Sequence, residues 1–393
     1  MVTKLNLSLL TITCIIYTLI FDTLSIMNFG RSLSALQTVA YPKIATFFAA
    51  LISLITIRLA ITSKNYLGGR ERLLLAVLIL FWGYTVIGNN FHGARISLQA
   101  ILFPLTMFGL VLSSEYNQIL RAIAFAGVLI MLICSCMLIV APDTAFYNSA
   151  AFGVDKAILG SRLLAGPFSH PNALGAAMLI ISPAFLILSK NRRILFLLCS
   201  FVTILMTGSR TSIYIFLFWV LVLMVPIHKA VKKRILLVGT LASLVLMFII
   251  PFVVRQNDSF SNRGQIWIES RNYVFKSPIF GHGADFYSNE LDRNSLLIKS
   301  ALNGHNLMFD ILIKYGLVGL VLLFAFFVII LLPVRSSSNF SVIQGSYLFL
   351  FFSSGITETH FSVTSMGELG FLFWVIFPIV ILNRTKSQNL DKL

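Results

Sequence analysis

The sequence predicts an all-α polytopic membrane protein, folded as a single integral membrane domain over residues 1–393. Of these residues, 58% are hydrophobic and 11% are charged, and the mean hydropathy is +0.90. A soluble domain carries about 25% charged residues, so the composition excludes that class. Backbone groups in lipid must be paired within a helix or a closed barrel, and the long uncharged runs favour helices.

Uncharged apolar runs predict about twelve membrane spans, each near the roughly 20 residues that cross ~30 Å of hydrocarbon. The first run lacks a convincing small-residue cleavage site, so we interpret it as a retained helix rather than a signal peptide. In chain order the predicted spans are Leu5–Ile26, Ile44–Ile61, Leu73–Ile87, Ile96–Leu112, Ile119–Val140, Ala173–Leu188, Ile194–Met206, Thr211–Ile227, Ile235–Val254, Gly316–Val334, Gln344–Gly355 and Gly367–Leu382.

The placement of Lys and Arg predicts which ends of the spans face the cytoplasm. With the N-terminus inside, the inner loops collect most basic residues, including the run HKAVKKR from His228 to Arg234. This positive-inside bias accounts for most of the formal net charge of +16, so the charge indicates a bilayer with anionic lipid. We therefore expect an inner (plasma) membrane protein with no nucleic-acid partner.

The longest outer segment is the loop over residues 255–304, from Arg255 to Gly304. We expect amphipathic helices in it, because apolar residues recur at helical spacing after Arg263 and suggest a helix along the membrane surface. This expected face comprises Ile266, Trp267, Ser270, Tyr273 and Val274. The other outer segments are Ala141–Pro171, Thr207–Ser212 and Thr357–Ser362.

Three outer residues are the main functional candidates. Arg210 lies in the short turn TGSRTS, where positive-inside proteins avoid cations, and is either an interfacial anchor or a functional group. Arg263 either contacts lipid headgroups or binds a ligand. His305 is either a satisfied polar residue or a catalyst, and it precedes an amphipathic stretch in which Asp310 and Lys314 are spaced to pair.

Other outer residues have simpler structural interpretations. His170, in GPFSHPNALG, opens a predicted span in which Asn172 is the expected helix cap and Gly175 a close-packing residue. His282 lies between glycines, which favours a tight turn. Glu358 and its neighbour His360 form the last outer cluster, either a gate or an ordinary surface.

Together these segments resemble the O-antigen ligase and polymerase superfamily. The resemblance rests on TGSRTS, NRGQIWIESRNYVFKSPIFGHG, GPFSHPNALG and above all HNLMFDILIKYGLVG, which fits the family pattern of His-Asn, nine residues and Gly-x-x-Gly. An O-antigen ligase-like core region thus covers residues 160–319, whereas the first 140 residues match in hydropathy alone. In the last segment, Gly316 and Gly319 should let the helix after His305 turn closely into the next span.

The resemblance implies a membrane glycosyltransferase with a C-type fold, acting on a glycan carried by undecaprenyl diphosphate. His305 would be the base for an acceptor hydroxyl, and Arg210 and Arg263 would hold the diphosphate leaving group. One direct displacement would invert the anomeric carbon. The loop over residues 255–304 and the active site would then face the periplasm.

We expect neither a cofactor nor a metal, because the two arginines would supply the positive charge that a metal ion provides in other glycosyltransferases. The outer acidic pair Glu290 and Asp292, in NELDRN, resembles a solvated surface turn. The cysteines lie within apolar spans, which favours buried thiols over disulfides or metal ligands. They are Cys14, Cys134, Cys136 and Cys199. Further candidates for substrate binding are Arg271, His170, Asn306 and Trp267.

Four functions stay open. A polymerase adds the growing chain to the next lipid-linked repeat unit, and a ligase moves the finished chain to lipid A-core; both need the same base and arginines. The compact outer loop and FSHPNALG, which resembles stretches of Wzy-type polymerases, favour a polymerase of lipopolysaccharide biosynthesis, with a chain-length regulator as an expected partner. A flippase or other transporter should show internal repeats or mid-membrane charges, and no obvious repeat is present. In a purely structural assembly protein, Arg210, Arg263 and His305 would be replaceable.

Overall fold

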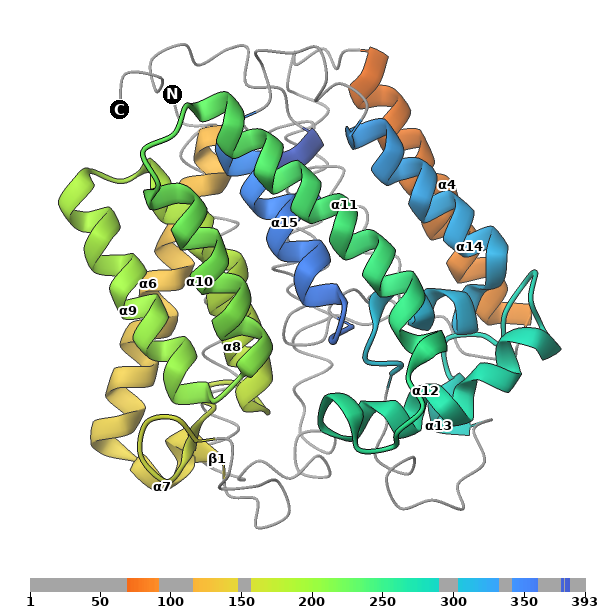
Figure 1. Ribbon diagram of the computed structural model, residues 1–393, viewed down its shortest axis with the longest axis horizontal. Coiled ribbons are helices and arrows are strands. Elements are labelled where there is room, and N and C mark those ends of the chain that lie inside the picture. The colour runs from red at the N-terminus through yellow and green to blue at the C-terminus, as the bar shows by residue number, and fades with distance from the viewer. Residues whose placement is uncertain are drawn as a thin grey trace.

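The computed structural model describes residues 69–91, 116–147, 157–289, 303–331, 341–359, 376–377 and 379–381. These parts of the chain are mainly helical, in agreement with the predicted all-α class, and carry one short antiparallel ribbon in which Phe146 pairs with Leu164 (Figure 1). The elements are α4 (Gly69–Phe91), α6 (Tyr116–Val140), α7 (Pro142–Ala145), β1 (Phe146–Tyr147), β2 (Leu163–Leu164), α8 (Pro171–Ile181), the 3-10 helix η2 (Ser182–Ile187), α9 (Lys190–Thr207), α10 (Arg210–Met224), α11 (Lys229–Val253), α12 (Ser259–Lys276), α13 (Phe286–Asn289), α14 (Leu307–Leu331) and α15 (Val342–Gly355).

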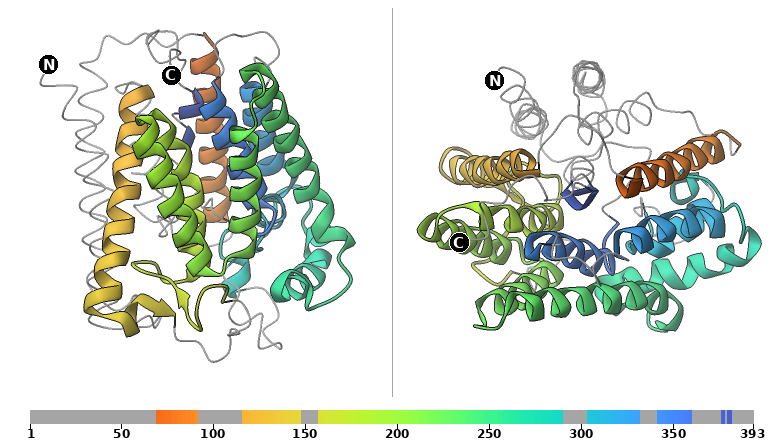
Figure 2. Two further views of the ribbon diagram at one scale, coloured as in Figure 1. Left: turned by 60° about the vertical axis from the view of Figure 1, so that its left-hand side comes forward. Right: turned by 90° about the horizontal axis from the view of Figure 1, so that it is seen from above.

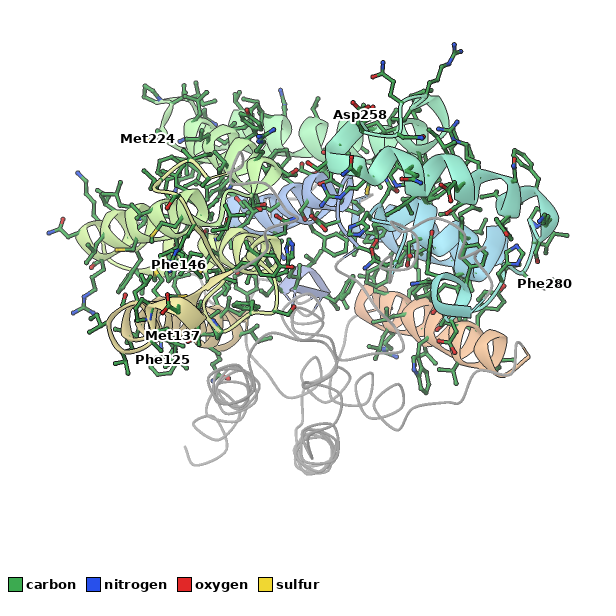
Figure 3. The ribbon with its side chains drawn as sticks, turned by 90° about the horizontal axis from the view of Figure 1, so that it is seen from below. Phe125, Met137, Phe146, Met224, Asp258 and Phe280 are labelled. Carbon is green, nitrogen blue, oxygen red and sulfur yellow. The ribbon has the colours of Figure 1, made fainter. Side chains whose placement is uncertain are left out.

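Helices of the described part have the length and surface of membrane spans. Three of them, α6, α11 and α14, are long and apolar enough to cross a bilayer. Large apolar side chains also point outward, and Leu132 and Val245 are each about half exposed. Phe125 and Phe280 lie on opposite outer edges of the bundle (Figure 3). Outward apolar surface of this extent indicates contact with lipid.

Most predicted spans within the described residues coincide with helices. Leu73–Ile87 lies in α4, Ile119–Val140 in α6 and Gln344–Gly355 in α15. Three other predicted spans lie outside the described residues, and Gly367–Leu382 lies largely outside them, so the count of twelve stays a prediction. The three are Leu5–Ile26, Ile44–Ile61 and Ile96–Leu112.

One predicted span is wrong as a continuous helix. Over Ala173–Leu188 the chain forms α8 and then, from Ser182, the tighter helix η2. Pro183 has no N–H to donate to the carbonyl four residues earlier, so the regular α-helical ladder is interrupted there. The hydroxyl of Ser182 donates to the Met178 carbonyl at 2.6 Å and pairs one backbone group at the transition.

Helix α15 lies between the group of α8 to α10 and the pair of α4 and α14 (Figure 2). It packs closely along α11 because small residues face the contact. A Cβ on Gly239 would lie 2.8 Å from the Phe349 ring, and the hydroxyl oxygens of Ser243 and Ser353 are 2.8 Å apart. The N-terminus of α15 is closed by a reciprocal capping box between Ser341 and Gln344.

Different helices and helix ends lie at the two ends of the bundle. Helices α4 and α11 begin at the same end, the upper one in Figure 1, with Arg72, Lys229 and Lys232 in their first turns. Helices α12 and α13 lie at the opposite end. Which of these ends faces the cytoplasm stays a prediction.

Helix α14 is broken at Gly316, whose φ of 62° and ψ of −164° are not helical. The predicted turn at Gly316 is therefore confirmed, and a short helix over residues 307–315 precedes the apolar remainder of α14. A Cβ on Gly319 would lie 2.4 Å from Cβ of Tyr315 and 3.4 Å from the ring of Tyr84 on α4, so these neighbours leave no room for a side chain there. The hydroxyl of Tyr84 donates to the Tyr315 carbonyl at 2.9 Å, beside the break.

The segment over residues 278–283 forms backbone hydrogen bonds with α14 on both sides of the break at Gly316. A broken helix leaves N–H and C=O groups without their usual partners, and unpaired groups are costly away from water. Here the four groups at residues 313, 314, 317 and 318 are all paired. The bonds run from Leu317 N to Pro278 O (2.8 Å), Val318 N to Ile279 O (3.2 Å), His282 N to Ile313 O (2.9 Å) and Gly283 N to Lys314 O (2.8 Å).

We expect Gly316→Ala to destabilise the protein by about 2–4 kcal/mol, because it strains the backbone and overpacks the contact. A Cβ at this residue would lie 2.3 Å from the carbonyl oxygen of Ile279. Tryptophan fluorescence during thermal unfolding in detergent measures the change. Gly88→Ala on α4 is the matched control, since nothing lies within 4 Å of its Cβ. Equal melting temperatures of the two variants would contradict the structural role of Gly316.

Candidate functional site

His305 lies in a tight loop before α14 and has a positive φ of 47°. A residue with a side chain rarely adopts this conformation, so its surroundings must hold it. The His305 N–H donates to Asn303 Oδ1 at 3.0 Å, and the Gly304 N–H donates to Asp310 Oδ1 at 2.8 Å. The indole N–H of Trp267 donates to the Gly304 carbonyl at 2.7 Å. These bonds fix the backbone of the loop that carries the imidazole.

Asn306 joins the His305 loop to α14 and to the residue after α15. Its side-chain oxygen accepts from the N–H of Phe309 at 3.0 Å, which caps the first turn of α14. Its amide nitrogen donates to the carbonyl of Ile356, just after α15, at 3.0 Å. Asn306 is fully buried, and both polar groups of its side chain are hydrogen-bonded to the backbone. A contribution of Asn306 to substrate binding stays a prediction.

The predicted pair of Asp310 and Lys314 is confirmed, with 3.0 Å between Oδ2 and Nζ. The Asp310 side chain is only 2% exposed and that of Lys314 is 13% exposed. The buried carboxylate is therefore compensated by the ammonium group and by the N–H of Gly304. Burial, and then the charge of Asp310, raise the pKa of Tyr287 well above its usual range, which keeps that phenol neutral.

Helix α12 supplies Arg263. Residues 260–262 have left-handed backbone angles, and the helical geometry begins at Arg263. Of the residues on the expected amphipathic face, Ile266, Trp267, Ser270 and Val274 are buried, and the predicted position of the helix along the membrane surface stays a prediction. Arg263 is at the start of the regular helix, and only 12% of its side chain is exposed.

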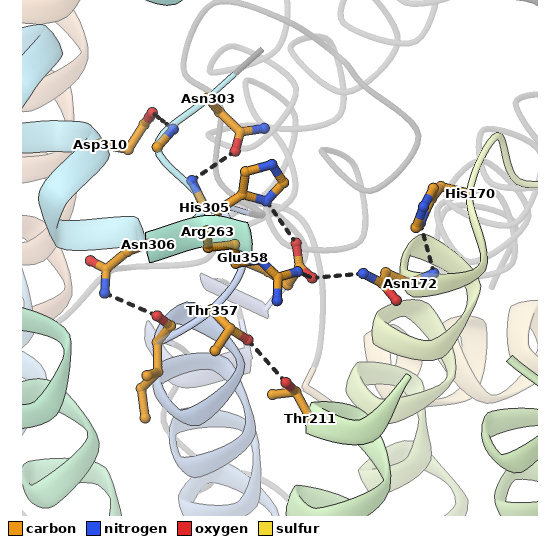
Figure 4. A network of polar contacts seen from close by, with 12 residues as sticks. His170, Asn172, Thr211, Arg263, Asn303, His305, Asn306, Asp310, Thr357 and Glu358 are labelled. Atoms are coloured by element: carbon orange, nitrogen blue, oxygen red, sulfur yellow. Dashed lines mark hydrogen bonds and ion pairs between the residues drawn. The ribbon is translucent and has the colours of Figure 1, made fainter. Parts of the chain in front are cut away.

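The carboxylate of Glu358 lies at the centre of the site, just after α15 (Figure 4). Its Oε1 forms an ion pair with Nη2 of Arg263 and accepts from Nδ2 of Asn172 at 3.2 Å. Its Oε2 lies 3.5 Å from Nδ1 of His305. At this distance the contact is electrostatic rather than a formed hydrogen bond. Glu358 thus brings together α8, α12 and the His305 loop.

From the sequence, Glu358 is interpreted as part of either a gate or an ordinary surface. Its contacts with Arg263, Asn172 and His305 are not predicted by the sequence. A weak signal was present, because the chain has only 14 acidic residues and Glu358 is the one acid of its outer segment. Nothing in the sequence indicated that α12 and α8 would meet that segment. Its neighbour His360 lies outside the described residues, as do Glu290 and Asp292.

The turn that carries Arg210 contacts the segment that carries Glu358. Helix α9 ends at Thr207, Gly208 adopts a left-handed conformation, and α10 begins at Arg210. Next to Arg210, the hydroxyl of Thr211 accepts from Thr357 at 3.2 Å. Arg210 is exposed at this end of the bundle, on the same side as Arg263 and His305.

His170 caps α8, which corrects the prediction that Asn172 is the cap. Nδ1 of His170 accepts from the Asn172 N–H at 3.1 Å, and Pro171 occupies the first helical position. This leaves the Asn172 amide side chain to bind Glu358. The close packing expected at Gly175 is confirmed, since a Cβ there would lie 2.9 Å from Cβ of Ser209.

Two other predicted residues support the backbone of the outer loop. Arg271 donates from Nε to the carbonyl of Pro251 at 2.7 Å and from Nη2 to that of Val254, at the C-terminal end of α11. His282 lies in the expected turn, where its Nε2 is 2.8 Å from the Tyr273 carbonyl oxygen. Substrate binding by Arg271, Trp267 and His170 stays a prediction.

The site combines a candidate base, a cation and an acid within one partly open cluster. The His305 side chain is 31% exposed, whereas its Nδ1 atom is buried toward Glu358. An imidazole beside a carboxylate can accept a proton, and a guanidinium group can bind phosphate oxygens. Among the described residues, no group of three His, Cys, Asp or Glu side chains is placed to hold a metal ion.

Comparison with known families agrees with the predicted resemblance. Residues 194–324 match the family model described as O-antigen ligase. The match extends from α9 into α14, so it includes Arg210, Arg263 and His305. Glu358 and Asn172 lie outside the matched residues. Comparison with curated proteins gives no match.

We expect Asp310→Asn to destabilise the protein by about 3 kcal/mol, because it leaves the ammonium group of Lys314 without its buried partner. Thermal unfolding in detergent measures this change. Asp143→Asn is the matched control, since Asp143 pairs with Arg162 at 2.8 Å but its side chain is 81% exposed. That variant should change stability by less than about 1 kcal/mol. Similar losses in both variants would contradict the role of Asp310 in holding the His305 loop.

Proposed function

Residues 194–324 carry a region of the O-antigen ligase/polymerase superfamily, and on this premise we propose that the chain is an inner-membrane glycosyltransferase. It polymerises undecaprenyl-diphosphate-linked oligosaccharide repeat units into O-antigen or a related surface polysaccharide. The observation that carries the proposal is the meeting of His305, Arg263 and Glu358 in one cluster (Figure 4). This cluster contains a proton acceptor and an anion-binding group, which glycosyl transfer from a diphosphate requires.

In the proposed reaction, a hydroxyl of the acceptor sugar attacks the anomeric carbon of the donor. His305 takes the hydroxyl proton as the new C–O bond forms. The bond from the anomeric carbon to the diphosphate oxygen breaks, and its electron pair leaves with undecaprenyl diphosphate. A single displacement of this kind inverts the anomeric configuration.

The orientation of His305 supports its role as the base. Nδ1 is buried and faces Oε2 of Glu358 at 3.5 Å, so Nε2 is the ring nitrogen left for the acceptor hydroxyl. A neutral imidazole can accept the proton of an acceptor hydroxyl, as a general base must. The carboxylate beside it favours the imidazolium that forms when the proton is taken.

The arginines are proposed to hold the diphosphate. Negative charge grows on the leaving group as the sugar bond breaks, so a fixed cation stabilises the transition state more than the bound substrate. Arg263 is partly buried in the cluster, and Arg210 begins α10 beside the Thr211–Thr357 contact. A guanidinium group keeps its charge throughout and matches phosphate oxygens with paired N–H groups.

The cluster is proposed to face the periplasm. It lies at the end of the bundle where α12 and α13 lie, opposite the basic first turns of α4 and α11 (Figure 1). Basic residues accumulate on the cytoplasmic side of membrane proteins. Lipid-linked repeat units on the outer leaflet would therefore reach His305, and a separate chain-length regulator is an expected partner there.

A ligase that transfers the finished chain to lipid A-core is the second candidate. It is favoured by the description of the matched family model, which names O-antigen ligase. Both reactions use an acceptor hydroxyl and the same leaving group, so His305 and the arginines would have the same roles in each. The acceptor alone distinguishes the two activities.

We expect His305→Ala to abolish the activity, because the variant removes the group proposed to take the acceptor proton. The test is a gel of surface lipopolysaccharide from a strain that lacks the native gene and expresses each variant at matched levels. His228→Ala is the matched control, because His228 caps α11 at the opposite end of the bundle. It should leave the polysaccharide ladder unchanged.

The pattern of the His305→Ala gel separates the candidates. Core carrying single repeat units identifies a polymerase, whereas bare core with long chains retained on undecaprenyl diphosphate identifies a ligase. An unchanged ladder would remove His305 from the mechanism and favour a transporter.

We also propose that the transfer needs no metal ion. The carboxylate of Glu358 is paired with Arg263, and a neighbouring guanidinium charge disfavours binding of a divalent cation. Turnover by the purified protein should therefore persist in excess EDTA. Loss of activity in EDTA that Mg²⁺ or Mn²⁺ restores would contradict this assignment.

A further inference from the structure

Glu358 contacts two residues of the proposed reaction, and one of these contacts occupies the guanidinium group that the diphosphate would need. It forms an ion pair with Arg263, the proposed diphosphate ligand, and it lies 3.5 Å from the proposed base. We propose that Glu358 is a positioning residue that exchanges partners when the donor binds. Its carboxylate leaves Arg263 to the diphosphate and forms a hydrogen bond with Nδ1–H of His305. The proposal rests on the function proposed above and adds how donor binding regulates the base.

Competition for Arg263 is the first step of the argument. The carboxylate and a phosphate oxygen would approach the same guanidinium group, and a planar fork binds either anion in the same way. The Arg263 and Glu358 side chains are only 12% and 19% exposed. Water screens their charges little at this burial, so a carboxylate left on Arg263 would strongly repel the diphosphate.

His305 offers the carboxylate its alternative partner. Nδ1 of His305 is buried and has no hydrogen-bond partner among the described residues, and Oε2 of Glu358 is already 3.5 Å away. A buried N–H without a partner is unfavourable. A shift of Oε2 by a few tenths of an ångström toward Nδ1 would form the missing hydrogen bond and lower the free energy. A small movement therefore brings Oε2 to Nδ1, and a turn of the carboxylate away from Nη2 of Arg263 completes the exchange.

The backbone at Glu358 stays in place during such a movement. The Glu358 N–H donates to the Ser354 carbonyl at 3.1 Å, and the neighbouring Thr357 hydroxyl is bonded to Thr211 at 3.2 Å. The terminal torsion of a glutamate side chain is broad, so the carboxylate can turn without a change of backbone. Asn172, 3.2 Å from Oε1, limits how far it turns.

The exchange would couple donor binding to the strength of the base. A hydrogen bond from Nδ1–H to a carboxylate orients the imidazole and stabilises the imidazolium form. Before the diphosphate binds, Glu358 is shared with Arg263 and gives His305 less support. His305 would therefore become fully effective only when the donor sugar is in place.

The test compares Glu358→Gln with Glu269→Gln in the full chain purified in detergent. Glu269 lies on α12 and accepts from Gln265 at 2.7 Å, so its variant removes the same charge from outside the cluster. Binding of inorganic pyrophosphate is measured by calorimetry, without turnover. Glu358→Gln should bind pyrophosphate about tenfold more tightly than the wild type, whereas Glu269→Gln should not.

Kinetics with lipid-linked repeat units then separate positioning from a general structural effect. For Glu358→Gln the KM for the donor should fall, and kcat should fall about tenfold or more. A variant that is merely misfolded would lose pyrophosphate binding as well. If Glu358→Gln binds pyrophosphate no more tightly than the wild type, or if kcat is unchanged, the exchange is wrong.

Two further variants test whether the gain in pyrophosphate affinity depends on Arg263 and replace Glu358→Gln if it does not accumulate. In Arg263→Ala with Glu358→Gln, the gain in pyrophosphate affinity should disappear, because it depends on the freed guanidinium. If Glu358→Gln does not accumulate, Glu358→Asp should give an intermediate gain, and an unchanged affinity would contradict the proposal. Failure of the proposed function would be visible separately, as turnover that persists in His305→Ala.

Discussion

The backbone exchange at the break in α14 is the constraint on which the rest of the site depends. The segment over residues 278–283 supplies the partners that Gly316 removes from the helix. A break without these partners would leave several backbone groups unpaired in an apolar surrounding. By binding both sides of the break, the outer loop is fixed to α14. This fixes α12, and with it Arg263 and Trp267, relative to the His305 loop.

Charge pairs at this end of the molecule differ according to their burial. Asp310 and Lys314 form a buried pair whose carboxylate also binds the Gly304 N–H, so it stabilises one loop conformation. The pair of Glu358 and Arg263 is partly open, and its carboxylate has a second cationic neighbour when His305 is protonated. A pair of this kind can be rearranged by an anionic ligand, whereas breaking the buried pair would be far more costly.

Several predicted site residues act in this structure through the backbone. Trp267 and Asn306 are fully buried and hold the loop on either side of His305, and Arg271 binds the carbonyl groups at the end of α11. Their spacing in the sequence indicates which face of a helix they occupy, but it does not indicate their partners. His305 differs from them because part of its ring is exposed and its backbone is held in a rare conformation.

The sequence by itself determined the features that depend on near neighbours. Apolar runs predict the helices, the segment TGSRTS predicts the turn before α10, and Gly316 predicts the turn in α14. A spacing of four residues predicts the pairing of Asp310 with Lys314. Only the tertiary structure decided that Glu358 would meet Arg263, Asn172 and His305. Each of these residues comes from a different element, and their contact depends on how the helices pack. Helical periodicity and local propensity carry no information about that packing, because they extend over only a few turns.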